Sequence, residues 1–362
     1  MENWNKLRDM CDANARKIYG RLLPAFVKER LEEELEYIKK NGWAKDFLDA
    51  AEFMAGDYFT KDDRFNKGFR CSLGSSFAAY LCNITAMNPL EFYKYRKMSL
   101  YSRMFYEKEK LMFYINLPDR IIKEVEQREI KVPECMCLLS SKNLTLLDQL
   151  QRATGEKYCC RIQSDLKSTI GNYMALFLYE DGFDEKGYPS EGNVLAGCIP
   201  EFEGGSELFV EILDTMRLYA RLPRTITEMA QILGLLHGQG TWIENAQELY
   251  LQCDCEGKNV NEYLITCVED VYEILKEKGI SDDEAMEIAL NVGKGYRRVS
   301  REDIMQMEEA GCDELFLESV RKIDYLFSRA QCLQYAWETV RIIYYLLYFK
   351  EQYMKEIEYE RD

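Results

Sequence analysis

Apolar positions recur at helical spacing between residues 4 and 55. Leu31, Leu35 and Ile38 share one helical face. The glutamates among them are predicted to lie on the solvated side, namely Glu32, Glu33, Glu34 and Glu36. The pair Asn41-Gly42 is typical of a helix C-terminus, and a second helical pattern follows over residues 47–54. This part of the chain is therefore predicted to be helical.

The middle of the chain changes to strand-like patterning. Residues 111–117 and 131–139 are rich in aromatic and aliphatic side chains and are predicted to be strands. The charged residues 118–130 between them form a helix or a long connection, and a Gly/Ser turn within 69–83 leads into an apolar helix. The fold class predicted is α+β, with a small sheet in a mixed N-terminal half.

The C-terminal part of the chain is predicted to be helical throughout. Glycine and proline cluster over 182–205, which marks a boundary, and helical spacing resumes from 208 to 358. Ser281 opens a capping-box pattern for a helix that runs to Val292. We therefore divide the chain into residues 1–60, 61–200 and 201–362.

The amino-acid composition and the net charge exclude two classes of protein. The 362 residues carry 47 Lys and Arg against 63 Asp and Glu, a net charge of −16, and 47% are hydrophobic. This excludes a disordered chain and a protein that coats nucleic acid through bulk charge, although a local basic groove remains compatible. The start of the chain has no apolar signal stretch, and its longest uncharged run, 71–90, is too polar to span a membrane. A cytoplasmic protein with no membrane partner is predicted.

The cysteine and histidine residues do not indicate a metal-binding or a catalytic site. Thirteen cysteines are an odd number, and close pairs such as Cys135/Cys137 and Cys253/Cys255 do not have zinc-ligand spacing. Reduced, mostly buried thiols and no bound metal are predicted. His237 is the only histidine, so Cys-His or Ser-His-Asp catalysis has little support.

Several short sequence motifs, taken together, resemble those of a known protein family. Five blocks resemble, in order, the PolC-type DNA polymerase III alpha subunit of Gram-positive bacteria; they are Tyr19-Gly20 with Glu34-Leu35, Arg70-Cys-Ser-Leu-Gly-Ser-Ser-Phe77, Cys198-Ile-Pro-Glu-Phe202, Asn245-Ala-Gln-Glu-Leu249 and Phe327-Ser-Arg-Ala330. The resemblance implies a polymerase palm over residues 1–200, its first 60 residues helical, and a helical fingers-like domain over 201–362. The family's zinc knuckle, thumb and further modules look reduced or missing.

The resemblance also identifies the positions where polymerase chemistry would occur. In the family, three aspartates on two palm strands hold two metal ions, and those positions correspond here to Tyr114, Asn116 and Cys137. A neutral amide and a thiol cannot balance two hard divalent cations, which prefer anionic oxygens. We therefore predict a degenerate relative without catalytic residues and without a cofactor. Mg²⁺ would be required only if this alignment were wrong and the chain were an active DNA-directed DNA polymerase.

Binding is the function that the resemblance leaves open. The family's nucleotide triphosphate lies at the Gly-Ser-Ser element, which implies phosphate contacts for Arg70, Ser72, Gly74, Ser75 and Ser76; the alternative is a tight turn with a capped helix. Fingers positions imply roles for Lys294, Arg329 and Gln331, unless these simply occupy a solvated helix face. Residues 93–106 interleave five aromatic side chains with basic ones suited to single-stranded nucleic acid, namely Lys94, Arg96, Lys97 and Arg103; an amphipathic helix is the alternative.

The sequence thus predicts a non-catalytic protein that binds DNA or a nucleotide weakly. Two other functions remain. A scaffold protein would bind a protein partner, or a second copy of itself, through an exposed apolar patch. An active polymerase would need three carboxylates within metal-bridging distance.

Overall fold

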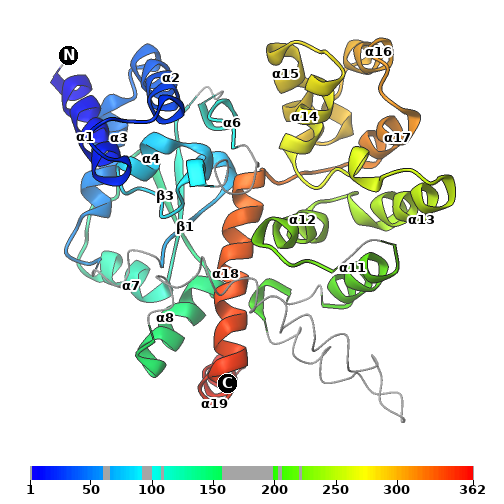
Figure 1. Ribbon diagram of the computed structural model, residues 1–362. Helices are drawn as coiled ribbons and strands as arrows, with labels where there is room; N and C mark the ends of the chain where they lie inside the picture. Colours follow the sequence, from blue (N-terminus) through cyan, green and yellow to red (C-terminus); the bar gives the residue numbers. More distant parts are fainter. Residues whose placement is uncertain are drawn as a thin grey trace. The chain divides into compact units, whose positions relative to one another are not determined.

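The computed structural model describes residues 2–59, 66–91, 100–106, 110–156, 199–202, 206–219 and 222–361. The chain divides into two compact units, one of residues 1–160 with 358–362 and one of residues 161–357 (Figure 1). The boundaries predicted at residues 60 and 200 stay predictions. In the described part of the chain, no helix has the length and apolar character that crossing a membrane requires.

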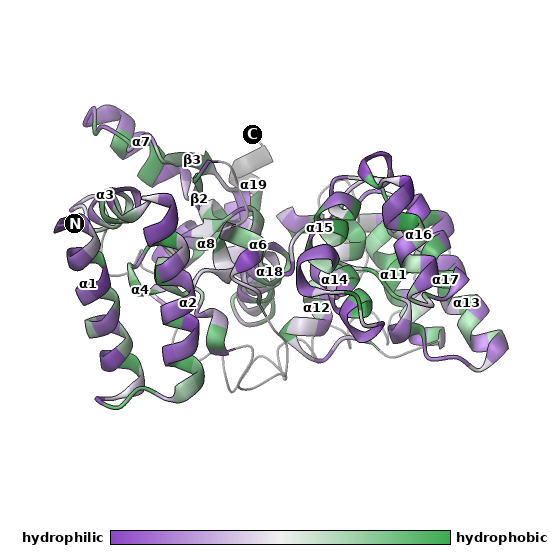
Figure 2. Ribbon diagram, turned by 90° about the horizontal axis from the view of Figure 1, so that it is seen from above, coloured by the Kyte–Doolittle hydropathy of each residue, from purple (hydrophilic) through white to green (hydrophobic). Residues whose placement is uncertain are grey.

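The first unit combines helices with a small sheet, which confirms the predicted α+β fold with a reduced sheet. Its elements are α1 (Glu2–Tyr19), α2 (Ala25–Asn41), α3 (Ala44–Met54), β1 (Gly68–Phe69), the 3₁₀ turn η2 (Cys71–Ser75), α4 (Phe77–Leu81), α6 (Arg103–Tyr106), β2 (Phe113–Leu117), α7 (Asp119–Gln127), β3 (Met136–Ser140) and α8 (Lys142–Thr154). Figure 2 shows hydrophilic residues along most of α1 and α2.

The three strands are ordered β1-β2-β3. β1 pairs with β2 in the antiparallel sense, and β2 pairs with β3 in the parallel sense, with α7 in the connection between them. On one face of strand β2, Phe113, Ile115 and Leu117 are fully buried; on the other face Tyr114 is partly exposed and Asn116 is buried. The Phe113 ring meets Phe47 of α3 edge-on at 5.0 Å between centroids. One sheet face is therefore part of the hydrophobic core.

The described part of the second unit is helical, as predicted for residues 201–362. Its elements are the short turn η4 (Pro200–Phe202), α11 (Ser206–Tyr219), α12 (Ile226–His237), the irregular turn η5 (Trp242–Ala246), α13 (Gln247–Glu256), η6 (Val260–Glu262), α14 (Val268–Glu277), α15 (Asp282–Gly293), η7 (Tyr296–Arg298), α16 (Arg301–Glu309), α17 (Glu314–Lys322), α18 (Arg329–Tyr348) and α19 (Lys350–Arg361). α12 packs along α18, and α14 packs against α15. The Ser281 side chain caps α15 by accepting the Glu284 N–H, which confirms the predicted start of that helix.

Candidate functional site

The sheet brings together the three residues that the alignment places at metal positions. Tyr114 of β2 and Cys137 of β3 are direct register partners. Asn116 lies two residues further along β2 and therefore faces the same side. Tyr114 is 36% exposed, whereas Asn116 is only 2% exposed. The sheet thus brings together a phenol, an amide and a thiol, at the positions that the alignment assigns to the family's carboxylates.

The nearest carboxylate in the sequence is engaged elsewhere. Asp119 begins α7, where its side chain accepts a hydrogen bond from the Ser140 hydroxyl and its backbone N–H donates to Thr145 Oγ1 at 3.0 Å. Across the residues that the structure describes, no cluster of three or more His, Cys, Asp or Glu side chains is arranged to hold a metal ion. The donor set at the sheet does not suit Mg²⁺.

Arg70 supplies a positive charge to the same sheet face. It follows β1 directly, and its backbone N–H donates to the Tyr114 carbonyl at 3.1 Å. Its guanidinium Nε donates to Asn116 Oδ1 at 3.2 Å. Arg70 is exposed, and no carboxylate of the described residues forms an ion pair with it. A buried neutral amide therefore orients this guanidinium and leaves its charge uncompensated.

The Gly-Ser-Ser element that follows is mostly buried. The Ser72 hydroxyl donates to the Met104 carbonyl at 2.5 Å, and a Cβ at Gly74 would lie 2.0 Å from the Phe69 ring. Ser75 is fully buried, and its hydroxyl has no hydrogen-bond partner. Ser76 caps α4 by accepting the Ala79 N–H at 3.0 Å. Of the five residues predicted to contact a phosphate, only Arg70 is exposed.

A protein carboxylate occupies the start of α4. Glu34 of α2 is fully buried and accepts the backbone N–H groups of Phe77 and Ala78, each at 2.9 Å. The Tyr106 hydroxyl, 2.9 Å away, and Arg30 Nε, 2.6 Å away, also donate to it. Burial, together with the Glu34 charge, holds the pKa of Tyr106 well above its ordinary value.

The prediction that Glu34 lies on the solvated side of its helix was wrong, because these donors stabilise its charge inside the protein. The Phe77 and Ala78 amides, which directly follow the residues predicted to contact a phosphate, donate to Glu34. Nucleotide contacts by Ser72, Gly74, Ser75 and Ser76 stay a prediction.

Comparison with known proteins shows a similarity to bacterial DNA polymerase III. Residues 5–119 match the family described as bacterial DNA polymerase III alpha NTPase domain. The PolC-type DNA polymerase III of Oceanobacillus iheyensis is 23% identical over 472 residues, and the Staphylococcus aureus strain MW2 protein is 25% identical over 480 residues. These matches cover 94% and 95% of this chain. The Caldanaerobacter subterraneus subsp. tengcongensis protein is 28% identical over 216 residues, 60% of this chain.

This chain is similar to PolC-type DNA polymerase III over almost its whole length. It spans 32% of the length of the Oceanobacillus protein and 14% of the Caldanaerobacter protein. The Oceanobacillus alignment runs over 472 positions, although 94% of 362 residues is only about 340. The relative therefore has about 130 residues inside the aligned region that this chain lacks. The match at residues 5–119 includes Arg70, Tyr114 and Asn116, but it ends before Cys137.

The predicted fingers residues lie in different environments. Arg329 is 5% exposed, and its guanidinium donates to Glu273 Oε1 at 2.7 Å and to Asp270 Oδ1 at 2.9 Å. Gln331 is buried at the start of α18, where its amide donates to the Tyr335 hydroxyl at 3.3 Å. Lys294 is exposed just beyond α15. The expectation that these residues simply share a solvated helix face is wrong for Arg329 and Gln331, and their role in binding stays a prediction.

The basic and aromatic segment is only partly described. Lys94, Arg96 and Lys97 lie outside the described residues, and Arg103 begins α6. Of the aromatic residues in this segment, Phe105 and Tyr106 are buried. These two rings therefore pack inside the first unit, as the amphipathic-helix alternative expects. Nucleic-acid contacts of the four basic residues stay a prediction.

Proposed function

We propose that this PolC homologue binds DNA through backbone phosphates without transferring nucleotides, in the cytoplasm and without a metal cofactor. The exposed Arg70 guanidinium, oriented by buried Asn116 and without a carboxylate partner among the described residues, supports this proposal. Arginine presents several N–H donors in a planar fork that matches phosphate oxygens. Only one of those donors is used by Asn116.

The same geometry argues against metal chemistry at this position. Tyr114, Asn116 and Cys137 offer neutral donors, whereas two Mg²⁺ ions need anionic oxygens. Arg70 already lies against the Asn116 amide oxygen, so a divalent cation there would meet a like charge. Because the start of α4 is filled by the Glu34 carboxylate, we assign the phosphate contact to Arg70 rather than to the α4 amides.

The test is fluorescence anisotropy of a labelled primer–template titrated with the full chain across a salt series. Binding should weaken steeply with salt because counterions are released from the DNA. Arg70→Ala should weaken binding about tenfold and lower the salt slope by about one phosphate contact. The matched control is Arg8→Ala, an exposed arginine on α1 that already pairs with Asp9, and it should bind like the unmodified chain.

The effect of Mg²⁺ on DNA affinity and the extension of a primer are two further measurements. At constant ionic strength, Mg²⁺ should weaken binding rather than strengthen it, because it competes with the protein for the DNA phosphates. Primer extension with Mg²⁺ and all four deoxynucleotides should yield no product. Extension that exceeds the background of a mock preparation would show that catalysis is retained. Failure to bind at low salt would refute DNA binding and would favour a protein partner or a second copy of the chain.

A further inference from the structure

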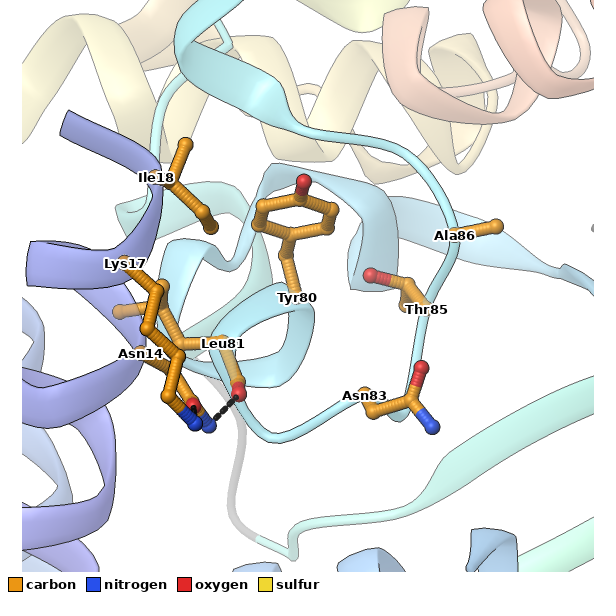
Figure 3. Close-up of a pocket in the computed structure, with 8 residues that line it drawn as sticks. All are labelled: Asn14, Lys17, Ile18, Tyr80, Leu81, Asn83, Thr85 and Ala86. Carbon is orange, nitrogen blue, oxygen red and sulfur yellow. Dashed lines mark hydrogen bonds between the residues drawn. The ribbon is translucent and has the colours of Figure 1, made fainter. Parts of the chain in front are cut away.

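A cavity lies in the first unit between α1 and the turn that follows α4, and none of the sheet-face residues lines it. Its volume is about 520 Å³, which falls in the usual range for small-molecule sites. α1 contributes Lys17 and Ile18 to its wall, and the opposite wall includes Tyr80, Asn83 and Thr85. In Figure 3 the Tyr80 ring stands between Ile18 and Thr85, and the Thr85 hydroxyl is turned toward that ring. The cavity therefore combines an apolar wall with polar side chains.

The α1 side of the cavity offers a positive charge. Lys17 Nζ donates to Asn14 Oδ1 at 3.1 Å, and Asn14 Nδ2 in turn donates to the Leu81 carbonyl at 2.9 Å. These bonds hold Asn14 between α1 and the end of α4. No carboxylate of the described residues pairs with Lys17, and none of the residues lining the cavity is acidic. In a chain of net charge −16 this is a locally positive site.

The opposite wall is rich in hydrogen-bond donors. Buried Lys67 donates to the Asn83 side-chain oxygen at 3.0 Å and to the Asn83 backbone carbonyl. Since the amide oxygen is used in this way, Asn83 has its NH₂ group left to donate. Thr85 is 3% exposed, and its hydroxyl has no hydrogen-bond partner. An unpaired buried hydroxyl is costly, and an acceptor on a ligand would remove that cost.

We propose that this cavity binds a compact ring compound that carries a phosphate or carboxylate, of the size of a nucleoside monophosphate. The Lys17 ammonium attracts the anion, while Asn83 and Thr85 donate to acceptor atoms on the ring or on the anionic group. Ile18 and the Tyr80 ring cover the apolar body. This inference does not rest on DNA binding, because it uses none of the residues at the sheet face.

The experiment is isothermal titration of the full chain with four probes. Adenosine monophosphate tests ring and phosphate together, adenosine tests the ring alone, inorganic phosphate tests the anion alone, and benzoate tests a ring with a carboxylate. Binding of adenosine monophosphate or benzoate at least tenfold tighter than that of adenosine and phosphate is expected. Whichever of adenosine monophosphate and benzoate binds more tightly shows whether the cavity prefers a phosphate or a carboxylate. If neither ring-bearing anion binds, or if adenosine binds as tightly as its monophosphate, the proposal is overturned.

Three variants localise the binding. Lys17→Ala should weaken binding of the preferred anion about tenfold, and Thr85→Val about fivefold. Thr85→Val should fold at least as stably as the unmodified chain because it removes an unpaired hydroxyl. The control is Lys6→Ala, an exposed lysine on the same helix that does not line the cavity. Equal affinities in all three variants would place the ligand elsewhere and overturn the assignment.

The cavity and the sheet face can be tested independently. Arg70→Ala should leave the affinity for the small anion within twofold, and Lys17→Ala should leave DNA affinity within twofold. If the unmodified chain binds the small anion but does not bind DNA, only the proposed function is refuted. Loss of small-anion affinity in Arg70→Ala equal to that in Lys17→Ala would refute a separate cavity site.

Discussion

The buried carboxylate of Glu34 offers a direct test of how the first unit is held together. It joins three parts of the chain: its own helix α2 through Arg30, the start of α4 through the Phe77 and Ala78 amides, and α6 through the Tyr106 hydroxyl. The perturbation is Glu34→Gln, which keeps the shape of the side chain and removes its charge.

The magnitude follows from the contacts that a glutamine cannot make. Gln has one acceptor oxygen, so at least one of the two backbone N–H groups would face the NH₂ group and lose its acceptor. The Arg30 guanidinium, whose side chain is 15% exposed, would lose its ion-pair partner. Removing one member of a buried ion pair costs about 3–5 kcal/mol. We expect about 3 kcal/mol, at the lower end, because Arg30 also donates to the Ser75 carbonyl.

The assay is hydrogen exchange followed by mass spectrometry, read in peptides that cover α2 and α4. A local loss of about 3 kcal/mol corresponds to roughly a hundredfold faster exchange in those peptides, and peptides of the second unit should be unchanged. The control is Glu36→Gln, an exposed glutamate of the same helix. Acceleration of less than about threefold in Glu34→Gln, or equal acceleration in the control, would refute the reasoning.

Two further predictions concern the second unit. Burial raises the pKa of Glu269 from its usual 4.5 to about 7. The folded chain therefore binds this proton more tightly than the unfolded chain, so stability should fall by on the order of 3 kcal/mol as pH rises from 4.5 to 7, and Glu269→Gln should remove that dependence in urea unfolding. Gly240 and Gly257 both have left-handed φ, but a Cβ at Gly240 would lie 1.9 Å from the Lys322 carbonyl oxygen, whereas Gly257 has open space. Thermal unfolding should show that Gly257→Ala costs about 1 kcal/mol and Gly240→Ala at least twice as much.

Strands β2 and β3 could be predicted because the residue pattern that marks a strand lies within a few consecutive positions. Predicted residues 111–117 and 131–139 contain or overlap β2 and β3, since runs of aromatic and aliphatic residues with a buried face suffice to mark a strand. The resemblance to a family singled out Tyr114 and Cys137, and the register of the sheet places these two residues opposite each other. A period of two residues fixes which side chains share a face, so Asn116 followed from Tyr114.

Glu34 was misplaced although its position carried a usable signal. At 100° per residue it lies about 60° from Leu31 and about 40° from Ile38, at the edge of the apolar stripe, whereas Glu32 and Glu36 lie further from it. The charge of a glutamate favours a solvated position, whereas the helical periodicity places this residue next to the apolar side chains. Arg30, one turn earlier, was the available indication that a buried charge would be paired. The α4 amides and Tyr106 could not be predicted, because they lie more than forty residues away along the chain.

Long-range pairing also explains why Arg329 could not be interpreted from the sequence. Its partners Asp270 and Glu273 lie 59 and 56 residues earlier, on α14, and no local pattern connects them. A lysine in the same place would keep the charge but could not bridge two carboxylates with the geometry of a planar fork. A basic residue conspicuous in the sequence is therefore, in the structure, part of the interior of the second unit.

The sheet face shows why a single substitution would not turn it into a metal site. Arg70 lies against Asn116 because that side chain is neutral and presents an amide oxygen. Replacing Asn116 by aspartate would give Arg70 an ion-pair partner rather than create a metal ligand, since the guanidinium already lies within hydrogen-bond distance. The new carboxylate would also neutralise the charge proposed to hold DNA. Restoring a metal site would thus require carboxylates at Tyr114, Asn116 and Cys137 together.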